Sequence, residues 1–103
     1  MMRFNFRGPN GELYTEVFVD DKKNVKFKNH TDFWADCAFG KRTTATYGDV
    51  LTFFEMRTFP RNREDLPEIL EAMGLKEYDP YKMCIFSEGR CASDDDWIEF
   101  LEG

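Results

Sequence analysis

Three cysteines and one histidine are the side chains of this chain best suited to bind a metal ion or act as a nucleophile. They are Cys37, Cys84, Cys91 and His30. Their number fits a Cys3His zinc site, but the close pairs of ligands that most structural zinc sites use are missing. A catalytic thiolate needs an oriented base beside it, and no protease signature surrounds Cys37 or His30. We therefore expect free thiols, no metal, no cofactor and no catalytic residue, in a protein that is not an enzyme.

The acidic run Asp94, Asp95 and Asp96 supplies carboxylates of the kind that bind Mg²⁺ or Ca²⁺. Its spacing differs from that of an EF-hand loop, and no glycine stands where the sharp turn of such a loop needs one. The chain also contains no glycine-rich phosphate loop and no dinucleotide fingerprint. We interpret the run as a solvated turn or as an acidic surface that faces a partner. In either case we expect these charges to be exposed and unimportant for folding.

Three arginines, Arg57, Arg61 and Arg63, flank Pro60 in the segment FPRNRED. Arginines in a cluster can bind phosphate, but the acids that follow them would repel the same phosphates. We expect instead a corner between two helices, where the arginines hydrogen-bond the last carbonyls of the first helix. Their expected partners are the acids just after the corner, Glu64, Asp65 and Glu68.

The net charge of −6 is unevenly distributed. Residues 1–47 contain eight Lys and Arg against six Asp and Glu, a net of +2, whereas residues 48–103 contain six against fourteen, a net of −8. An acidic surface disfavours contact with nucleic acid and favours a basic protein surface. This asymmetry is the main functional indication in the sequence.

The bulk composition indicates one soluble domain covering residues 1–103. Apolar residues make up 42% of the chain and aromatic residues 17%, which is enough to form a core. The N-terminus lacks the apolar run of a signal peptide, and no segment reaches the roughly 20 apolar residues of a membrane helix. With three cysteines, an odd number, we expect free thiols in a reducing cytoplasm and no membrane partner.

Period-two alternation predicts three antiparallel strands near residues 2–7, 12–19 and 24–28. Asn10-Gly11 suits the turn between the first two. One face carries Phe4, Phe6, Val25 and Phe27, and the other carries Arg3, Asn5, Arg7, Lys26 and Lys28. RNA-binding sheets place aromatic residues on the exposed face, so we expect the basic face to be merely solvated.

Helical signals dominate the second half. A short helix within 29–40 should begin at Asn29 or Thr31 and end at Gly40. It should pack Phe33, Trp34, Cys37 and Ala38 on the sheet. A capping box at Thr46 and Asp49 should begin a helix that ends by Pro60. The next helix should carry the stripe Leu66, Ile69, Leu70 and Met73 and end in a Schellman motif at Gly74.

The last two elements complete the expected fold. Asp79-Pro80 should begin a helix that ends before Gly89. Ser93 with Asp96 could begin another, but the short, aromatic segment 97–101 favours a strand joining the N-terminal sheet. The expected fold is therefore α+β, with a three-stranded antiparallel sheet, a C-terminal strand beside it, and three to four short helices packed against it.

Several short motifs resemble a family of small, uncharacterised proteins of Gram-positive bacteria and their mobile elements. The motifs are AFG (38–40), TYGD (46–49), FPRNRED (59–65), MGL (73–75), YDPY (78–81), GR (89–90) and DDDWI (94–98). The resemblance covers the last two-thirds of the chain, and it implies gene neighbourhoods of HipA-like kinases or prophage regions. It assigns no catalytic residue. The chain departs from the usual form at Cys91 and in the acidic tail.

Charge and resemblance together suggest two functions. The first is a small acidic, non-enzymatic binding protein from a phage or mobile element. It would inhibit or regulate a nucleic-acid-handling protein by occupying its basic groove as a nucleic-acid mimic, as anti-CRISPR proteins do. The second is a toxin–antitoxin accessory protein that docks on a HipA-like kinase. The expected partner-binding residues are Glu64, Glu68, Glu71, Asp94, Asp95, Asp96 and Trp97.

Overall fold

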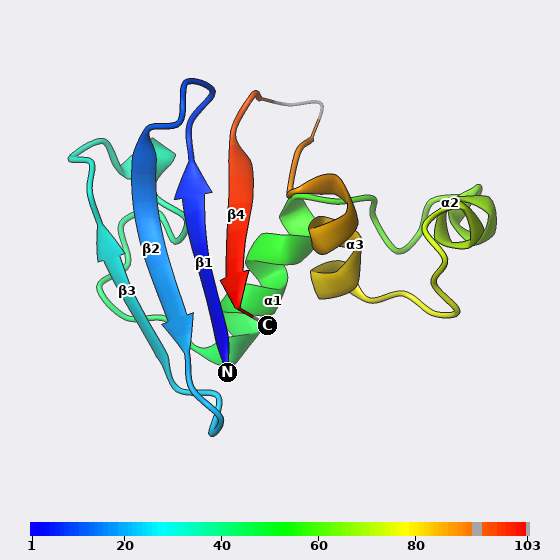
Figure 1. Cartoon of the computed structure of the whole chain (residues 1–103), viewed down its shortest axis with the longest axis horizontal. Coiled ribbons are helices and arrows are strands. Elements are labelled where there is room, and N and C mark those ends of the chain that lie inside the picture. Colours follow the sequence, from blue (N-terminus) through cyan, green and yellow to red (C-terminus); the bar gives the residue numbers. More distant parts are fainter. Residues whose placement is uncertain (92–93, 103) are drawn as a thin grey trace.

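The computed structural model describes residues 1–91 and 94–102 and contains a four-stranded antiparallel sheet in the order β3-β2-β1-β4 (Figure 1). The strands are β1 (Met2–Arg7), β2 (Leu13–Val19), β3 (Val25–Asn29) and β4 (Trp97–Glu102). The predicted α+β fold is confirmed, and the C-terminal segment joins the sheet beside β1 as expected. Ser93, the alternative helix start, lies outside the described residues.

The alternation in the strands sorts side chains between a covered and an open face of the sheet. Phe4 and Phe6 of β1 are buried, as are Val17 and Val19 of β2. On β3, Val25 and Phe27 pack against the core, whereas Lys26 and Lys28 are exposed. A two-residue period therefore places one face of each strand against the helices, as the sequence predicts.

Helix α1 (Tyr47–Met56) covers the sheet. The predicted capping box is present, because Thr46 and Asp49 each bond the other's backbone N–H. The helix buries Val50, Phe53 and Phe54, and the Phe54 and Phe4 ring centroids lie 5.1 Å apart. Aromatic packing between α1 and β1 thus forms the centre of the core.

Helix α3 (Pro80–Ser87) begins where predicted, with the Asp79 side chain accepting a bond from the Lys82 N–H. It contacts α1 and buries Met83 and Cys84. Within residues 1–91 and 94–102, no helix is long and apolar enough to cross a membrane.

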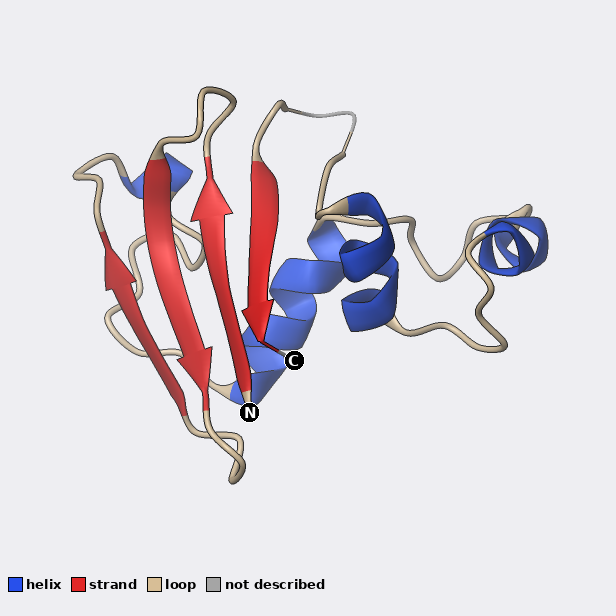
Figure 2. Cartoon of the chain, in the orientation of Figure 1, coloured by secondary structure: helices blue, strands red, loops and turns tan. Residues whose placement is uncertain are grey.

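Helix α2 (Leu66–Ala72) stands away from the rest of the fold (Figure 2). None of its residues is buried, and the core cluster of the described residues includes no side chain from α2. Its end is the predicted Schellman motif: Gly74 has φ 74°, and the Leu75 N–H donates to the Leu70 carbonyl at 2.8 Å. The helix and its predicted end are therefore confirmed. The expectation that this helix packs against the sheet is wrong, because its apolar stripe does not contact the core.

The predicted helix within 29–40 is wrong in extent. Only one 3₁₀ turn forms in this range, η1 (Trp34–Asp36). A helix does not begin at Asn29, because Asn29 belongs to β3 and its side chain accepts a bond from Thr15. Phe39 is the aromatic residue of this range that is buried in the core, and its ring centroid lies 4.9 Å from that of Phe27. Phe33 and Trp34, expected on the sheet, are 59% and 53% exposed.

Gly89→Ala should destabilise the fold far more than Gly74→Ala, although both glycines have similar positive φ angles of 64° and 74°. A Cβ at Gly74 meets nothing within 4 Å, whereas one at Gly89 would lie 2.5 Å from two side-chain atoms of the buried Ile98. We expect about 1 kcal/mol from the left-handed backbone in each case. Overpacking at Gly89 should add about 1–3 kcal/mol.

The two effects can be separated by measurement. Urea melts should show the Gly89→Ala loss, whereas the Gly74→Ala loss should appear mainly as faster hydrogen exchange within α2, because α2 lies outside the core. Equal losses of global stability in the two variants would contradict this packing.

Candidate functional site

Arg57 is a buried cation that joins the helices to the start of β4. It caps the end of α1 and is 6% exposed. Its Nε donates to the Gly89 carbonyl at 2.9 Å, and its Nη1 and Nη2 each donate to one carboxylate oxygen of Asp94 at 2.9 Å. Nη2 also donates to the Asp96 carbonyl at 2.7 Å. The expectation that Arg57 pairs with the acids of the next helix is wrong.

These bonds explain how the protein tolerates a charge in its interior. A buried guanidinium is costly unless an anion neutralises it and acceptors meet its N–H groups. Burial alone would lower the pKa of Arg57, but the hydrogen bond and charge of Asp94 outweigh it and raise that pKa. In return, the Arg57 hydrogen bond lowers the pKa of Asp94. The bonds of Arg57 therefore anchor Gly89, Asp94 and Asp96 to the end of α1.

Of the other two arginines of the corner, Arg63 has an expected partner and Arg61 a different one. The Arg63 Nε lies 2.6 Å from an Asp65 carboxylate oxygen, which confirms that pairing. Arg61 stacks on the ring of Tyr78, at 4.3 Å from its centroid. The Tyr78 hydroxyl donates to the Phe59 carbonyl and thus links the two ends of the segment 59–78, which contains α2. We call this segment the α2 arm.

Five acids from three separate segments gather at the end of the sheet that carries the β1–β2 turn. In Figure 1 that turn, η1 and the start of β4 lie at the same end. We call these residues the acidic rim: Glu12, Asp36, Asp94, Asp95 and Asp96.

The charges of four rim acids, Glu12, Asp36, Asp94 and Asp96, affect the pKa values of Asp96 and the neighbouring Tyr14. The pKa of Asp96 is raised by burial and then by the charges of Asp94, Asp36 and Glu12. Burial also raises the pKa of Tyr14, and the charges of the same acids raise it further. Like charges that repel one another across a folded surface produce a strongly negative local field.

The sequence-predicted partner residues divide between two surfaces. Asp94, Asp95 and Asp96 lie in the acidic rim. Glu64, Glu68 and Glu71 are exposed on or beside α2, on the arm that stands away from the sheet. The view of the three aspartates as surface charges unimportant for folding is wrong for Asp94, because it neutralises the buried Arg57.

Trp97 has a structural contact as well as a surface position. Its indole Nε1–H donates to the Gly8 carbonyl at 3.1 Å, which ties the start of β4 to the β1–β2 turn. The Arg90 guanidinium lies 5.3 Å from its ring centroid.

Two members of the rim, Glu12 and Asp36, were missed in the sequence. They lie in the half of the chain with positive net charge and approach the aspartates only in the fold. No short-range pattern could have found them.

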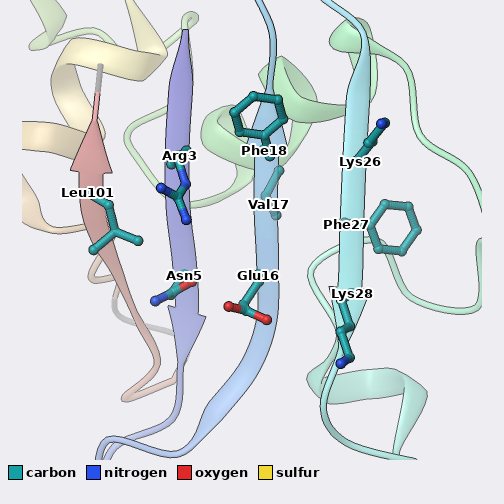
Figure 3. Close-up of a pocket in the computed structure, with 9 residues that line it drawn as sticks. All are labelled: Arg3, Asn5, Glu16, Val17, Phe18, Lys26, Phe27, Lys28 and Leu101. Carbon is teal, nitrogen blue, oxygen red and sulfur yellow. The ribbon is translucent and has the colours of Figure 1, made fainter.

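The open face of the sheet is shown in Figure 3, where nine labelled residues line a shallow hollow of about 280 Å³. Lys26 and Lys28 are exposed there, as predicted. Phe18, which the sequence interpretation overlooked, lies between Arg3 and Lys26 in the strand register. Because Val17 and Val19 face the core, the alternation of β2 predicts that Phe18 between them lies on the open face.

Two carboxylates, Glu16 and Glu99, lie among the basic residues of this open face. The Glu99 carboxylate accepts hydrogen bonds from the Arg7 Nε at 3.0 Å and the Asn5 Nδ2 at 2.9 Å. The Glu16 Oε2 lies 2.6 Å from the His30 Nε2. The face therefore mixes charges of both signs.

The cysteines are free and differ in exposure. Cys84 is fully buried beside the Phe54 carbonyl, and burial raises its pKa to about 12. Cys37 and Cys91 are half-buried. In the part of the chain that the structure describes, no three His, Cys, Asp or Glu side chains converge on a site that could hold a metal ion.

No protein-family model, curated protein or solved structure matches this chain.

Asp94→Asn and Asp96→Asn should change stability in opposite directions. The folded-state pKa of Asp94 is lowered, so its contribution is fully present above the unfolded pKa and is lost as pH falls through the folded one. At pH 7 we expect Asp94→Asn to cost about 2 kcal/mol, less than a fully buried pair, because Asp94 is partly exposed. The deficit should shrink below about pH 4.

Asp96→Asn provides the matched control. Its folded-state pKa is raised, so its carboxylate opposes folding once pH rises through that value. This variant should be at least as stable as the parent at pH 7. Urea melts between pH 2 and pH 7 test both expectations, and a pH-independent deficit for Asp94→Asn would contradict the ion-pair account.

Proposed function

We propose that this chain is a small acidic binding protein that docks on a basic surface of a partner protein through its acidic rim. The observation that carries the proposal is the convergence of Glu12, Asp36 and Asp94–Asp96 from three segments at one end of the sheet. Such a field attracts and orients a basic partner during encounter. It also repels nucleic acid, which is consistent with a partner that is a protein.

The partner class in this proposal is a nucleic-acid-handling protein whose basic groove the rim occupies, so that the chain inhibits or regulates it. A row of carboxylates held at fixed positions resembles a phosphate backbone in charge. The Arg57–Asp94 pair supports such a role because it holds Asp95 and Asp96 at defined positions. The resemblance to proteins of mobile elements also supports it, since anti-CRISPR proteins act on such grooves.

The proposal places the interface on the rim and not on the α2 arm. Burial, and then the charges of Asp94, Asp36 and Glu12, raise the pKa of Asp96, and a basic partner would relieve that repulsion. The α2 arm carries Glu64, Glu68 and Glu71 as exposed charges of a single segment.

A displacement assay tests this function. The chain is added to purified bacterial nucleic-acid-handling proteins, including CRISPR effectors, each bound to labelled nucleic acid. We expect at least one to release its nucleic acid. The apparent affinity should fall steeply with added salt, because the Debye length shrinks to about 8 Å at 0.15 M.

Charge reversal then locates the interface. Asp36→Lys with Asp95→Lys should slow association at least about tenfold while leaving the fold intact, since neither residue pairs with Arg57. The matched control is Glu68→Lys with Glu71→Lys on α2, which makes the same change in net charge. Equal effects of the two double variants, or affinity that does not depend on salt, would contradict the proposal.

A further inference from the structure

Three adjoining hollows meet at Met56, the last residue of α1. The first, of about 270 Å³, is lined among others by Cys37, Asp94 and Asp96. The second, of about 350 Å³, reaches Trp34. The third, of about 470 Å³, reaches Phe59. Met56 lines all three, so we call this surface the Met56 groove.

The groove is rich in apolar side chains that the fold leaves exposed. Met56 is 75% exposed and Trp34 is 53% exposed. Single exposed apolar residues are common, but these share walls with the buried Phe53 and with Ala38. Methionine and tryptophan are enriched at protein interfaces, and methionine adapts its shape to a ligand. The groove therefore has the composition of an interface centre.

The third hollow of the groove is lined by paired arginines, whereas the first is bordered by acids. At its third hollow the arginines are already paired, with the Arg63 Nε 2.6 Å from Asp65 and the Arg90 Nε 3.6 Å from Glu88. At its first hollow Asp96 lines the wall, and Asp95 is exposed next to it in the chain. The acidic rim thus borders the apolar centre on one side, where a basic group would meet it.

We propose that the Met56 groove binds a segment of the partner in which a large apolar side chain is flanked by lysine or arginine. The apolar side chain packs against Met56 in the first two hollows, and the neighbouring cation contacts the acidic rim. This inference rests on the proposed function, because it names the part of the basic partner that the same site recognises.

The test uses phage-displayed random dodecapeptides selected on the intact chain. We expect the selected peptides to share a large apolar residue with Lys or Arg within a few positions. One selected peptide, labelled with fluorescein, is then titrated against the parent, Met56→Ser and Phe86→Ser. Phe86 is the matched control, because it is 62% exposed on α3 and lines none of the three hollows.

Met56→Ser should weaken binding by about tenfold or more, whereas Phe86→Ser should leave it unchanged. The exposure of both residues predicts that both variants fold, which melting curves can verify. In addition, the ε-methyl resonance of Met56 should shift on peptide addition while that of the buried Met83 stays in place. Equal binding by the two variants, or selection without an apolar–basic pattern, would overturn the inference.

The groove and the proposed function can fail separately. If a displaced effector depends on Asp36 and Asp95 but not on Met56, the groove inference is wrong and the function stands. If the selected peptide depends on Met56 but not on salt or the rim, the apolar part stands, whereas the basic flank and the proposed function are contradicted.

Discussion

The buried guanidinium of Arg57 is the constraint on which the rest of the surface depends. A charge at the end of α1, nearly closed off from water, requires an anion and several acceptors within reach. Asp94 supplies the anion, and the carbonyls of Gly89 and Asp96 supply further acceptors. Gly89, Asp94 and Asp96 therefore lie at defined positions beside the end of α1.

Two features of the proposed interface follow from these positions. The Arg57–Asp94 pair places Asp95 and Asp96 at the end of the sheet where Glu12 and Asp36 already lie, and this completes the acidic rim. It also forms one wall of the Met56 groove, since Asp94 and Asp96 line the hollow beside Met56. An apolar centre with an acidic border is what a basic partner with an apolar anchor would fit. Core packing and the geometry of the proposed interface are thus coupled through one ion pair.

Local signals account for most of what the sequence could predict. The alternation of β1, the capping box at Thr46 and the Schellman motif at Gly74 depend on residues a few positions apart, and each was confirmed. The failures involve competition over longer distances. Phe39 took the core position expected for Phe33 and Trp34, and Arg57 paired 37 residues away instead of with its neighbours. The sequence predicted only part of the acidic rim. Asp94, Asp95 and Asp96 are consecutive and could be recognised, whereas Glu12 and Asp36 join them only in the folded protein.

A double-mutant cycle between Arg57→Met and Asp94→Asn tests the central claim most directly. Methionine keeps much of the apolar stem of arginine and removes its charge, so the cycle isolates the interaction between the two side chains. We predict a coupling free energy of unfolding of about 2 kcal/mol or more at pH 7, as expected where one partner is buried. A coupling below about 0.5 kcal/mol, typical of an exposed pair, would show that Arg57 and Asp94 do not hold this surface together.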